Sequence, residues 1–459
     1  MRTSPRTTRP AHARKGSALL VVLWVSLVAG LILLGVQKSL GTNLATSRGE
    51  LAAVQAHWLA RAGVETAIAV LTDDDAGSDG AWDEWYDNPD AFQEIELPGG
   101  MFSVTAPRGH LGDAGAVRYG LIDQSGLLNL NVADEAGLKA LDLLDGPQID
   151  AILDWRDNDN TPRAGGAEGM YYERLALPYT IRNGPFQTVR ELLLVRGIGP
   201  GTFAGEDADM DGLLDANEND LSASPPDDNG DGLLDAGLGG LATVWSYELN
   251  RDAFGNKRTD FNQADKKTLM EQFNFSDGLA SAIAESGGSG GGKSPGDAKG
   301  GKGSNRFSSL ADLLKVKAKG PARGEDEGKV NQIDLKWLAA NLDRITLTDQ
   351  DRLPGRINVN TASPAVLGSL PKMDRKAVDA ICRRQNAGEG PFTSVGELLT
   401  AGILTDEQFK ALVERVGVRG SVFEIRSSGM TRWGVRRQIV AVVDRAAEPV
   451  TILYWHQSD

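Results

Sequence analysis

The sequence contains little of the chemistry from which most enzyme active sites are built. It has four histidines in 459 residues, and no two of them lie at the spacing of a metal-binding pair or of a general base and its partner. No H-x-E motif occurs, and no set of Ser, His and Asp suggests a nucleophilic site. The only cysteine is Cys382, so an intramolecular disulfide is excluded. We therefore expect no catalytic residues and a protein that is not an enzyme.

The chain also lacks an excess of positive charge. It has 48 Lys and Arg against 63 Asp and Glu, which gives a net charge of −15. Nucleic-acid binding depends largely on neutralising phosphates with Lys and Arg, so this balance argues against a nucleic-acid partner. The length allows two or three domains, and 55 glycines indicate many turns and linkers.

A third absence is that of charge near the N-terminus, where residues 17–37 carry no ionisable side chain. This apolar run of about 21 residues is long enough to cross a bilayer as a helix. Five basic residues precede it without one acid, which places that end in the cytoplasm and the bulk of the chain outside. The segment "LVAG" at 27–30 could serve as a signal-peptidase site. The apolar pattern continues beyond it, however, and this favours a retained anchor.

The pattern after the anchor predicts one long helix followed by strands. The helix should continue to about Leu71. Its predicted apolar stripe consists of Leu51, Val54, Trp58, Leu59, Ala62 and Val64. Alternation with a period of two predicts strands at 101–107, 117–126, 422–430, 436–446 and 450–456. One sheet is therefore built from both ends of the chain, and the middle is an insertion.

That insertion, residues 127–420, is acidic, mostly helical and internally repetitive. "LLNLNVADEAGLKAL" resembles "RINVNTASPAVLGSL", and "GPFQTVRELLLVRGI" resembles "GPFTSVGELLTAGIL". A looser copy pairs "DFNQADKKTLMEQF" with "NRFSSLADLLKVKAKG". Each copy contains an S/T-x-x-E/D capping box behind a phenylalanine. The boxes are Thr188 with Glu191, Ser309 with Asp312 and Ser394 with Glu397, and the phenylalanines are Phe186, Phe307 and Phe392. We expect three helical hairpin units.

Two other motifs in the insertion have ordinary explanations. "GGSGGGKS" at 287–294 matches a phosphate-binding pattern, but it lies in a Gly- and Ser-rich segment, 286–305, that is typical of a flexible linker. The repeat motifs are shared with helix-hairpin-helix DNA receptors, which contact phosphate through a Gly-hydrophobic-Gly turn. The matching turns here, "LLDGPQID" and "LPKMDRKAVD", lack that turn. The missing turn argues against DNA binding. Because the other repeat motifs are shared, a membrane-anchored DNA receptor for uptake is kept as the alternative function.

The clearest candidate binding site is "DADMDGLLDANE" at 207–218, which has the ligand spacing of an EF-hand calcium loop. The predicted ligands are Asp207, Asp209, Asp211, Leu213 through its carbonyl, Asp215 and Glu218. The next loop is weaker because it ends in Leu238, and it supplies Asp227, Asn229, Asp231 and Asp235. Solvated acidic turns are the alternative for both loops.

A further acidic segment, "LDWRDNDNTPRAGGAEGMYYE", gathers four possible oxygen ligands. They are Asp154, Asp157, Asp159 and Glu168. These residues form either another oxygen-ligand site or a polar turn after a helix, and the sequence does not decide between the two. Calcium is the expected cofactor of the acidic loops.

The motifs together resemble a known family. "RKG" followed by "SALLVVLWV" is similar to a class III (prepilin-type) leader. With "LDWRD", "GAE…YY", "NGPFQTVRELLLVRGI" and "INVNTAS", the chain resembles the general secretion pathway protein K family, the largest minor pseudopilins of type II secretion systems. The resemblance covers essentially the whole chain.

The resemblance implies an α+β fold, in which a long pilin helix and a small antiparallel sheet are split by a large all-α insertion of helix-hairpin (SAM-like) repeats. The expected segments are a leader at 1–16, a transmembrane helix at 17–37, a first pilin-like part at 38–126, the insertion at 127–420 with calcium loops at 207–238 and a linker at 286–305, and a second pilin-like part at 421–459.

The resemblance also implies processing, location and partners. Prepilin peptidase would cut after Gly16 and leave Ser17 as the N-methylated first residue. The mature chain would be a single-pass inner-membrane protein with its bulk in the periplasm, and later a subunit at the pseudopilus tip. Its partners would be the I-, J- and H-type minor pseudopilins and the major pseudopilin.

Val21 occupies the fifth position of the expected mature chain. Most pilins have a glutamate there, which offsets the buried positive N-terminus of the subunit above, since an unpaired charge in that apolar core is costly. A subunit with nothing above it needs no such carboxylate, so Val21 fits a tip subunit. A tip minor pilin of a type IV pilus is the remaining alternative.

Overall fold

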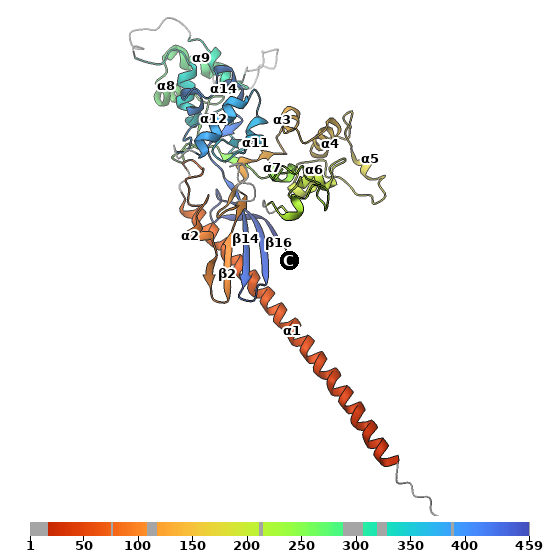
Figure 1. Ribbon diagram of the computed structural model, residues 1–459. Helices are drawn as coiled ribbons and strands as arrows, with labels where there is room; N and C mark the ends of the chain where they lie inside the picture. Colours follow the sequence, from red (N-terminus) through yellow and green to blue (C-terminus); the bar gives the residue numbers. More distant parts are fainter. Residues whose placement is uncertain are drawn as a thin grey trace, which may run out of the picture.

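The computed structural model describes residues 17–74, 77–107, 117–210, 214–287, 306–318, 328–386 and 390–458. Figure 1 shows a long helix, a small sheet packed beside the C-terminal end of that helix, and a large helix-rich insertion beyond the sheet. The expected leader with Gly16, and residues 288–305 of the predicted linker, lie outside the described residues.

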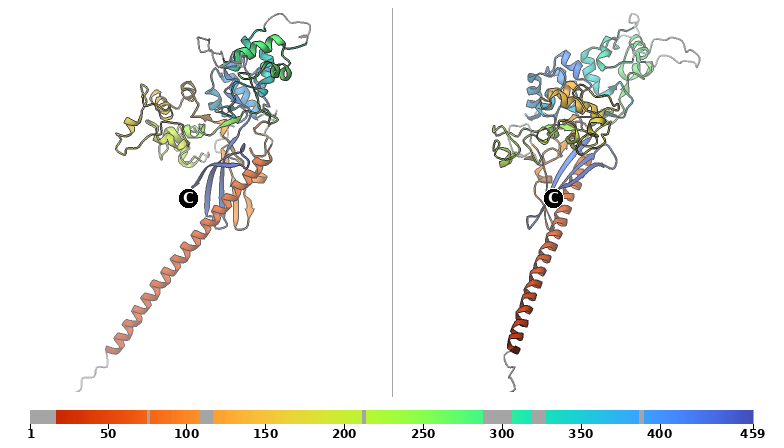
Figure 2. Two further views of the ribbon diagram at one scale, coloured as in Figure 1. Left: turned by 180° about the vertical axis from the view of Figure 1, so that it is seen from behind. Right: turned by 90° about the vertical axis from the view of Figure 1, so that its right-hand side faces the viewer.

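Helix α1 (Ser17–Asp73) joins the predicted anchor and the helix that follows it into one element of 57 residues. It contains no proline that would interrupt its hydrogen bonds. Within the described residues one stretch is long and apolar enough to cross a membrane, Ala18–Ser39, and none of it is buried by the rest of the chain. Both views of Figure 2 show this end of the helix projecting from the folded part. The helix ends close to the predicted Leu71.

The face of α1 that packs on the sheet includes only part of the predicted stripe, since Leu59 and Val64 are buried. Ala56 and Ala60 are fully buried, whereas Leu51, Val54 and Trp58 are 70%, 55% and 58% exposed. The prediction for these three large side chains is therefore wrong. Periodicity alone identifies an apolar face, but it does not say which apolar face the fold will use.

Close approach of the helix to the sheet explains the choice of small residues. A Cβ atom on Gly429 would lie 2.2 Å from the carbonyl oxygen of Ala56, and a Cβ on Gly63 would lie 2.2 Å from the Ser427 hydroxyl. The Ser427 hydroxyl also donates a hydrogen bond to the carbonyl of Ala60. Larger side chains on this face would hold the helix away from the strands.

The sheet is antiparallel and has the order β1-β2-β14-β15-β16, with β5 paired to the start of β14. Its strands are β1 (Ile95–Leu97), β2 (Gly100–Val104), β5 (Ile122–Asp123), β14 (Val422–Thr431), β15 (Arg436–Asp444) and β16 (Thr451–Ser458). Nearby lie α2 (Pro89–Phe92), β3 (Ala106–Pro107), β4 (Val117–Arg118) and η1 (Gln124–Gly126). The three predicted C-terminal strands are confirmed.

The predicted strand at 117–126 is instead two short strands followed by a turn. The Asp123 carboxylate accepts a hydrogen bond from the Ser125 N–H and begins η1, a local bond that competes with strand pairing.

The insertion consists of a first lobe (residues 128–243) and a second lobe (residues 247–417), which share one continuous apolar core. The first lobe contains β6 (Leu128–Asn129), α3 (Glu135–Ala140), α4 (Gly146–Arg156), α5 (Gly169–Tyr172), η2 (Val189–Leu194), α6 (Pro200–Ala204), η3 (Ala216–Glu218), α7 (Leu238–Leu241) and β7 (Ala242–Thr243). The second contains β8 (Tyr247–Leu249), β9 (Thr259–Asp260), α8 (Lys266–Phe273), α9 (Asp277–Gly287), η4 (Leu310–Lys315), α10 (Leu335–Asn341), η6 (Leu342–Arg344), β10 (Ile345–Thr346), β11 (Arg352–Pro354), β12 (Ile357–Asn358), α11 (Pro364–Gly368), α12 (Arg375–Asn386), α13 (Glu397–Thr400), α14 (Asp406–Leu412) and β13 (Val416–Gly417).

The insertion is helix-rich, but the expectation of an all-α insertion is wrong. Extended segments between the helices pair in twos, β6 with β7, β8 with β11, β9 with β10 and β12 with β13. These segments are largely buried, so their backbone N–H and C=O groups need hydrogen-bond partners, and the pairing supplies them.

Each of the three repeats is closed by the same asparagine clamp. Asn131, Asn262 and Asn360 each donate a side-chain hydrogen bond to the carbonyl of a phenylalanine and accept one from the N–H of that residue. The phenylalanines are Phe186, Phe307 and Phe392, the three that precede the capping boxes. Each clamp joins the first motif of a repeat to its second.

Two of the predicted capping boxes are confirmed, at Thr188 with Glu191 and at Ser309 with Asp312. The third is altered, because the Glu397 carboxylate accepts from the N–H of Thr393, one residue earlier than expected. The Ser394 hydroxyl still accepts from a backbone N–H, that of Gly396.

We expect Asn360→Ala to lower the free energy of unfolding by about 1–3 kcal/mol, because it leaves both polar groups of Phe392 without their buried partner. Urea unfolding of the full chain in detergent would measure the loss. Asn386→Ala, at an exposed position, is the control and should change stability by less than about 0.5 kcal/mol. Equal effects of the two substitutions would contradict the importance of the clamp.

Candidate functional site

Within the described residues, carboxylates come together in three places, in each of which three side chains have oxygens within 4.8 Å of one another. Two of these groups lie in the first lobe, in the acidic segments identified from the sequence. They are Asp154 with Asp157 and Glu168, and Asp207 with Asp209 and Glu218. The third lies at the C-terminal end of α1 and was not predicted.

The first group forms where the chain leaves α4 and returns to begin α5. A complete capping box between Asp145 and Gln148 starts α4. Asp154 lies in the last turn of that helix, and Asp157 is its C-terminal cap. The loop that follows brings back Glu168, which is the N-terminal cap residue of α5 but makes no capping hydrogen bond with its side chain. The two carboxylates of α4 and the one of α5 therefore face one point.

Glu168 is the most unusual side chain of this group. It is 4% exposed, and among the described residues neither of its carboxylate oxygens has a hydrogen-bond partner. Burial, together with the negative charges of Asp157, Asp154 and Asp159, raises its pKa to about 7. A buried carboxylate that receives no hydrogen bond is costly. A cation with oxygen ligands would satisfy both oxygens and offset the neighbouring charges.

Asp154 is fully buried, and burial raises the pKa of its carboxyl group. Its oxygens accept from the N–H of Arg163, and the Arg163 side chain lies 3.6 Å away. Gly166 is required beside it, because a Cβ at that position would lie 1.9 Å from Asp154 Oδ2. In the "GAE" motif, Gly166 thus allows the backbone to approach Asp154 closely, and Glu168 supplies the candidate ligand.

Asp159 lies at the rim of this group rather than within it. Its carboxylate accepts from the Thr161 N–H at 2.7 Å, while its charge acts on Glu168. The sequence left open whether this segment is a site or a polar turn. Its carboxylates converge, and those of Asp154 and Glu168 are buried.

The second group contains both ends of the predicted EF-hand-like loop. Glu218 is 2% exposed, and its two oxygens accept from the N–H groups of Ala208 and Asp215, at 2.9 and 3.1 Å. The last predicted ligand is therefore folded back onto the start of the loop, where Asp207 and Asp209 lie.

The other predicted ligands of this loop are placed differently. Asp211 and Leu213 lie outside the described residues. Asp215 is not in the group of three, and it is the N-terminal cap of the short 3-10 helix η3. The helix-loop-helix of an EF-hand is absent from the described residues here, since only the short α6 precedes the loop and η3 follows it.

The second acidic loop does not form a group of three carboxylates within the described ranges. Asn229 donates to Asp235, and the Asp231 carboxylate accepts from the N–H of Leu233. No contact is described for Asp227. The loop is organised by Glu206, whose carboxylate accepts from the N–H groups of Asn229 and Asp235.

Sequence spacing missed Glu206, because it lies one residue before the predicted loop. Glu206 is 7% exposed. Burial raises the pKa of the Asp235 carboxyl, and the charge of Glu206 raises it further.

The first lobe is joined to the sheet near the second group. Arg426 of β14 donates from Nη1 to the carbonyl of Met210 at 2.5 Å. An open cleft of about 560 Å³ lies beside this contact, between the lobe and strands β15 and β16. The conformation of the acidic loop at 207–218 can therefore influence the contact between the first lobe and strand β14.

Comparison with known proteins gives a consistent family. A family model described as type II secretion system (T2SS), protein K, matches residues 136–205. The matched segment is therefore similar to the protein K family of type II secretion systems. It includes the whole Asp154, Asp157 and Glu168 group, and the family is the one that the sequence motifs resemble.

A curated relative is the type II secretion system protein K of Pectobacterium carotovorum subsp. carotovorum, 28% identical over 200 residues. That match covers 40% of this chain and 58% of the relative, so the chain spans little more than half the length of the relative that it matches. A chain in the crystal structure of the GspK-GspI-GspJ complex from the enterotoxigenic Escherichia coli type 2 secretion system is 12% identical. It has a TM-score of 0.43 over 90% of this chain and 99% of that one.

Proposed function

We propose that this chain is a non-enzymatic minor pseudopilin of a type II secretion system that caps the tip of the pseudopilus and helps to nucleate its assembly. Two observations together carry the proposal. One segment matches the protein K family model, and the apolar half of the long N-terminal helix is not buried by the rest of the chain. A helix of this kind can anchor the chain in a bilayer and can later pack against the helices of other subunits.

The exposed side chains of α1 support the packing role. Leu51, Val54 and Trp58 lie beyond the membrane span and point away from the chain's own sheet. A soluble domain rarely leaves several large apolar side chains uncovered on one element. In a filament they would contact the helices of neighbouring subunits.

Two features support a position at the tip. The insertion lies beyond the end of the sheet that is farther from the apolar half of α1 (Figures 1 and 2), where it would obstruct a subunit stacked above. Val21 also stands where most pilins have a glutamate, so this chain lacks the carboxylate that would offset the N-terminal charge of such a subunit.

Processing and partners follow from the family resemblance. Prepilin peptidase would cut after Gly16, and Ser17 would be methylated. The apolar helix would anchor the chain in the inner membrane, with the bulk of the chain in the periplasm. The I- and J-type minor pseudopilins, then the H-type, and finally the major pseudopilin would join it. Helix-hairpin (SAM-like) repeats would make up the insertion.

We further propose that the two acidic groups of the first lobe bind calcium. All of their candidate ligands are oxygens, which suit a hard cation. Glu168 carries the argument for the first group, because its buried oxygens have no partner among the described residues. Asp154 and Asp157 would complete that site, and Asp207, Asp209 and Glu218 the other.

Labelling of isolated filaments tests the tip assignment. An epitope inserted into the Gly- and Ser-rich segment at 288–305 should give gold particles at one end of pseudopili made by cells that overproduce the major pseudopilin. The same epitope on the major pseudopilin is the control and should label the whole length. Particles of the first kind along the filament would mean that the chain is an internal subunit.

A further inference from the structure

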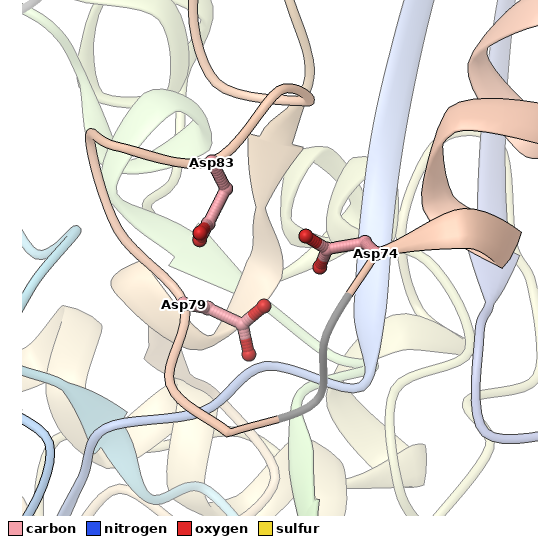
Figure 3. Close-up of side chains that lie close together, drawn as sticks. All are labelled: Asp74, Asp79 and Asp83. Atoms are coloured by element: carbon pink, nitrogen blue, oxygen red, sulfur yellow. The ribbon is translucent and has the colours of Figure 1, made fainter.

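The third carboxylate group lies where three parts of the fold meet. Asp74 directly follows α1, while Asp79 and Asp83 lie on the loop that leads away from it (Figure 3). The three side chains point toward one another, and each offers an oxygen within 4.8 Å of the others. In the sequence, this segment reads only as an acidic helix end.

Asp79 is held in place by the seam between the insertion and the sheet. Its backbone N–H donates to the carbonyl of Val418 at 2.8 Å, and its own carbonyl accepts from the Asn358 side chain at 3.1 Å. Its Oδ2 accepts from the N–H of Gly420 at 2.7 Å. Asn358 and Val418 belong to the end of the insertion, and Gly420 leads into β14. The carboxylate position is therefore fixed by long-range contacts rather than by its own loop.

One oxygen of this fixed carboxylate points into the group without a partner. Asp79 is fully buried, and its Oδ1 has no hydrogen-bond partner among the described residues. Burial raises the pKa of Asp79 to about 7, although Arg445 opposes the shift and Asp123 adds to it.

The neighbouring positive charge does not balance the group. Arg445 of the β15 end lies 2.5 Å from Asp74 and 2.8 Å from Asp79. Three carboxylates converge here, and Asp123, which is also buried, adds a fourth negative charge nearby. Among the described residues, one guanidinium therefore faces four acidic side chains in a poorly hydrated place.

We propose that Asp74, Asp79 and Asp83 form a further divalent-cation site, separate from the two in the first lobe, that takes calcium and fixes the end of α1 to the seam between sheet and insertion. The donors are all carboxylate oxygens, which favours calcium over metals that prefer nitrogen or sulfur. Asp79 Oδ1 supplies the fixed ligand, and Asp74 and Asp83 close around the ion from the two ends of the loop.

Such an ion would act as a brace. In the proposed function α1 would contact its neighbours in the membrane or the filament, while the insertion lies at the other end of the sheet. An ion bound by the residue after α1 and by a carboxylate anchored to Gly420 and Val418 would resist rotation of the insertion relative to the helix.

The test is calcium stoichiometry, measured by equilibrium dialysis with radioactive calcium on the full chain in detergent. The variant E168Q/E218Q disables the two first-lobe sites. At a free calcium concentration on the order of 1 mM, chosen for a weak extracellular-type site, this chain should still bind one ion. Adding Asp83→Asn should remove it. Adding Asp73→Asn, at the exposed neighbouring position, should not.

Two results would overturn the proposal: no calcium on a folded E168Q/E218Q chain, or equal binding with and without Asp83→Asn. If circular dichroism shows that the double variant is unfolded, the same comparison is made in the wild-type chain. There Asp83→Asn should lower the stoichiometry by one ion and Asp73→Asn by none, and an unchanged value for Asp83→Asn again overturns the site. If the first lobe binds no calcium, the comparison of Asp83→Asn with Asp73→Asn is unaffected. The two calcium proposals can therefore be contradicted independently.

Discussion

A chain that carries Gly16→Glu should accumulate as the full-length precursor, remain in the membrane and fail to enter pseudopili. In the proposed pseudopilin, processing would require the small residue before the cut, and without cleavage the basic leader would stay attached to the apolar helix. Five positive charges at the front of α1 cannot enter the apolar core of a filament without a large desolvation cost. Export of the system's substrates should fall to the level of a strain that lacks the gene.

Intact-mass analysis of the purified protein measures this directly. The wild-type chain should begin at methylated Ser17, and the variant at residue 1. Ala13→Ser changes the leader without touching the cut and is the control, for which wild-type processing is expected. A mature wild-type terminus between Ala29 and Ser39 would show ordinary signal-peptide cleavage and would contradict the pseudopilin proposal.

The sequence predicted those parts of the fold in which one local pattern dominates. The apolar run and the helical period gave α1 nearly to its last residue, and alternation gave β14, β15 and β16. It failed for the buried face of α1, where Leu51 and Trp58 are exposed. That choice depends on the short distance between the helix and Gly429, which is a property of the tertiary fold and not of the helix.

The candidate sites were predictable to the extent that their ligands are close in sequence. The spacing from Asp207 to Glu218 identified a loop whose two ends do meet. The segment from Asp154 to Glu168 was identified as acidic, but the sequence did not decide between an ion site and a polar turn. That choice depends on the burial of the carboxylates, which the sequence does not show. The Asp74, Asp79 and Asp83 group could not be found at all. The carboxylates of Asp74 and Asp79 are positioned by residues more than 300 positions away along the chain, such as Gly420 and Arg445.

Calcium should raise the melting temperature of the full chain, and EDTA should lower it. An ion that binds the folded state alone stabilises it by about 2.7 kcal/mol at a hundred times its dissociation constant. For a cooperatively unfolding unit of about 150–250 residues this corresponds to a shift on the order of 5–10 °C, and a larger unit shifts less. Magnesium should substitute poorly, because it is too small for carboxylates arranged around a larger ion.

Glu168→Gln separates a calcium ligand from a merely structural glutamate. In EDTA the variant should be at least as stable as the wild type, because it removes a buried charge beside Asp157 and Asp154. In calcium it should be less stable, since the neutral amide is a weaker ligand, and the order of the two melting temperatures should therefore reverse. Glu173→Gln, on the exposed side of the same short helix, should follow the wild type in both conditions. If the melting curve of the EDTA-stripped wild type, followed by circular dichroism, does not move at millimolar calcium, the ligand assignment at Glu168 is wrong. The proposed place of the chain at the pseudopilus tip would not depend on it, because that rests on α1, Val21 and the insertion.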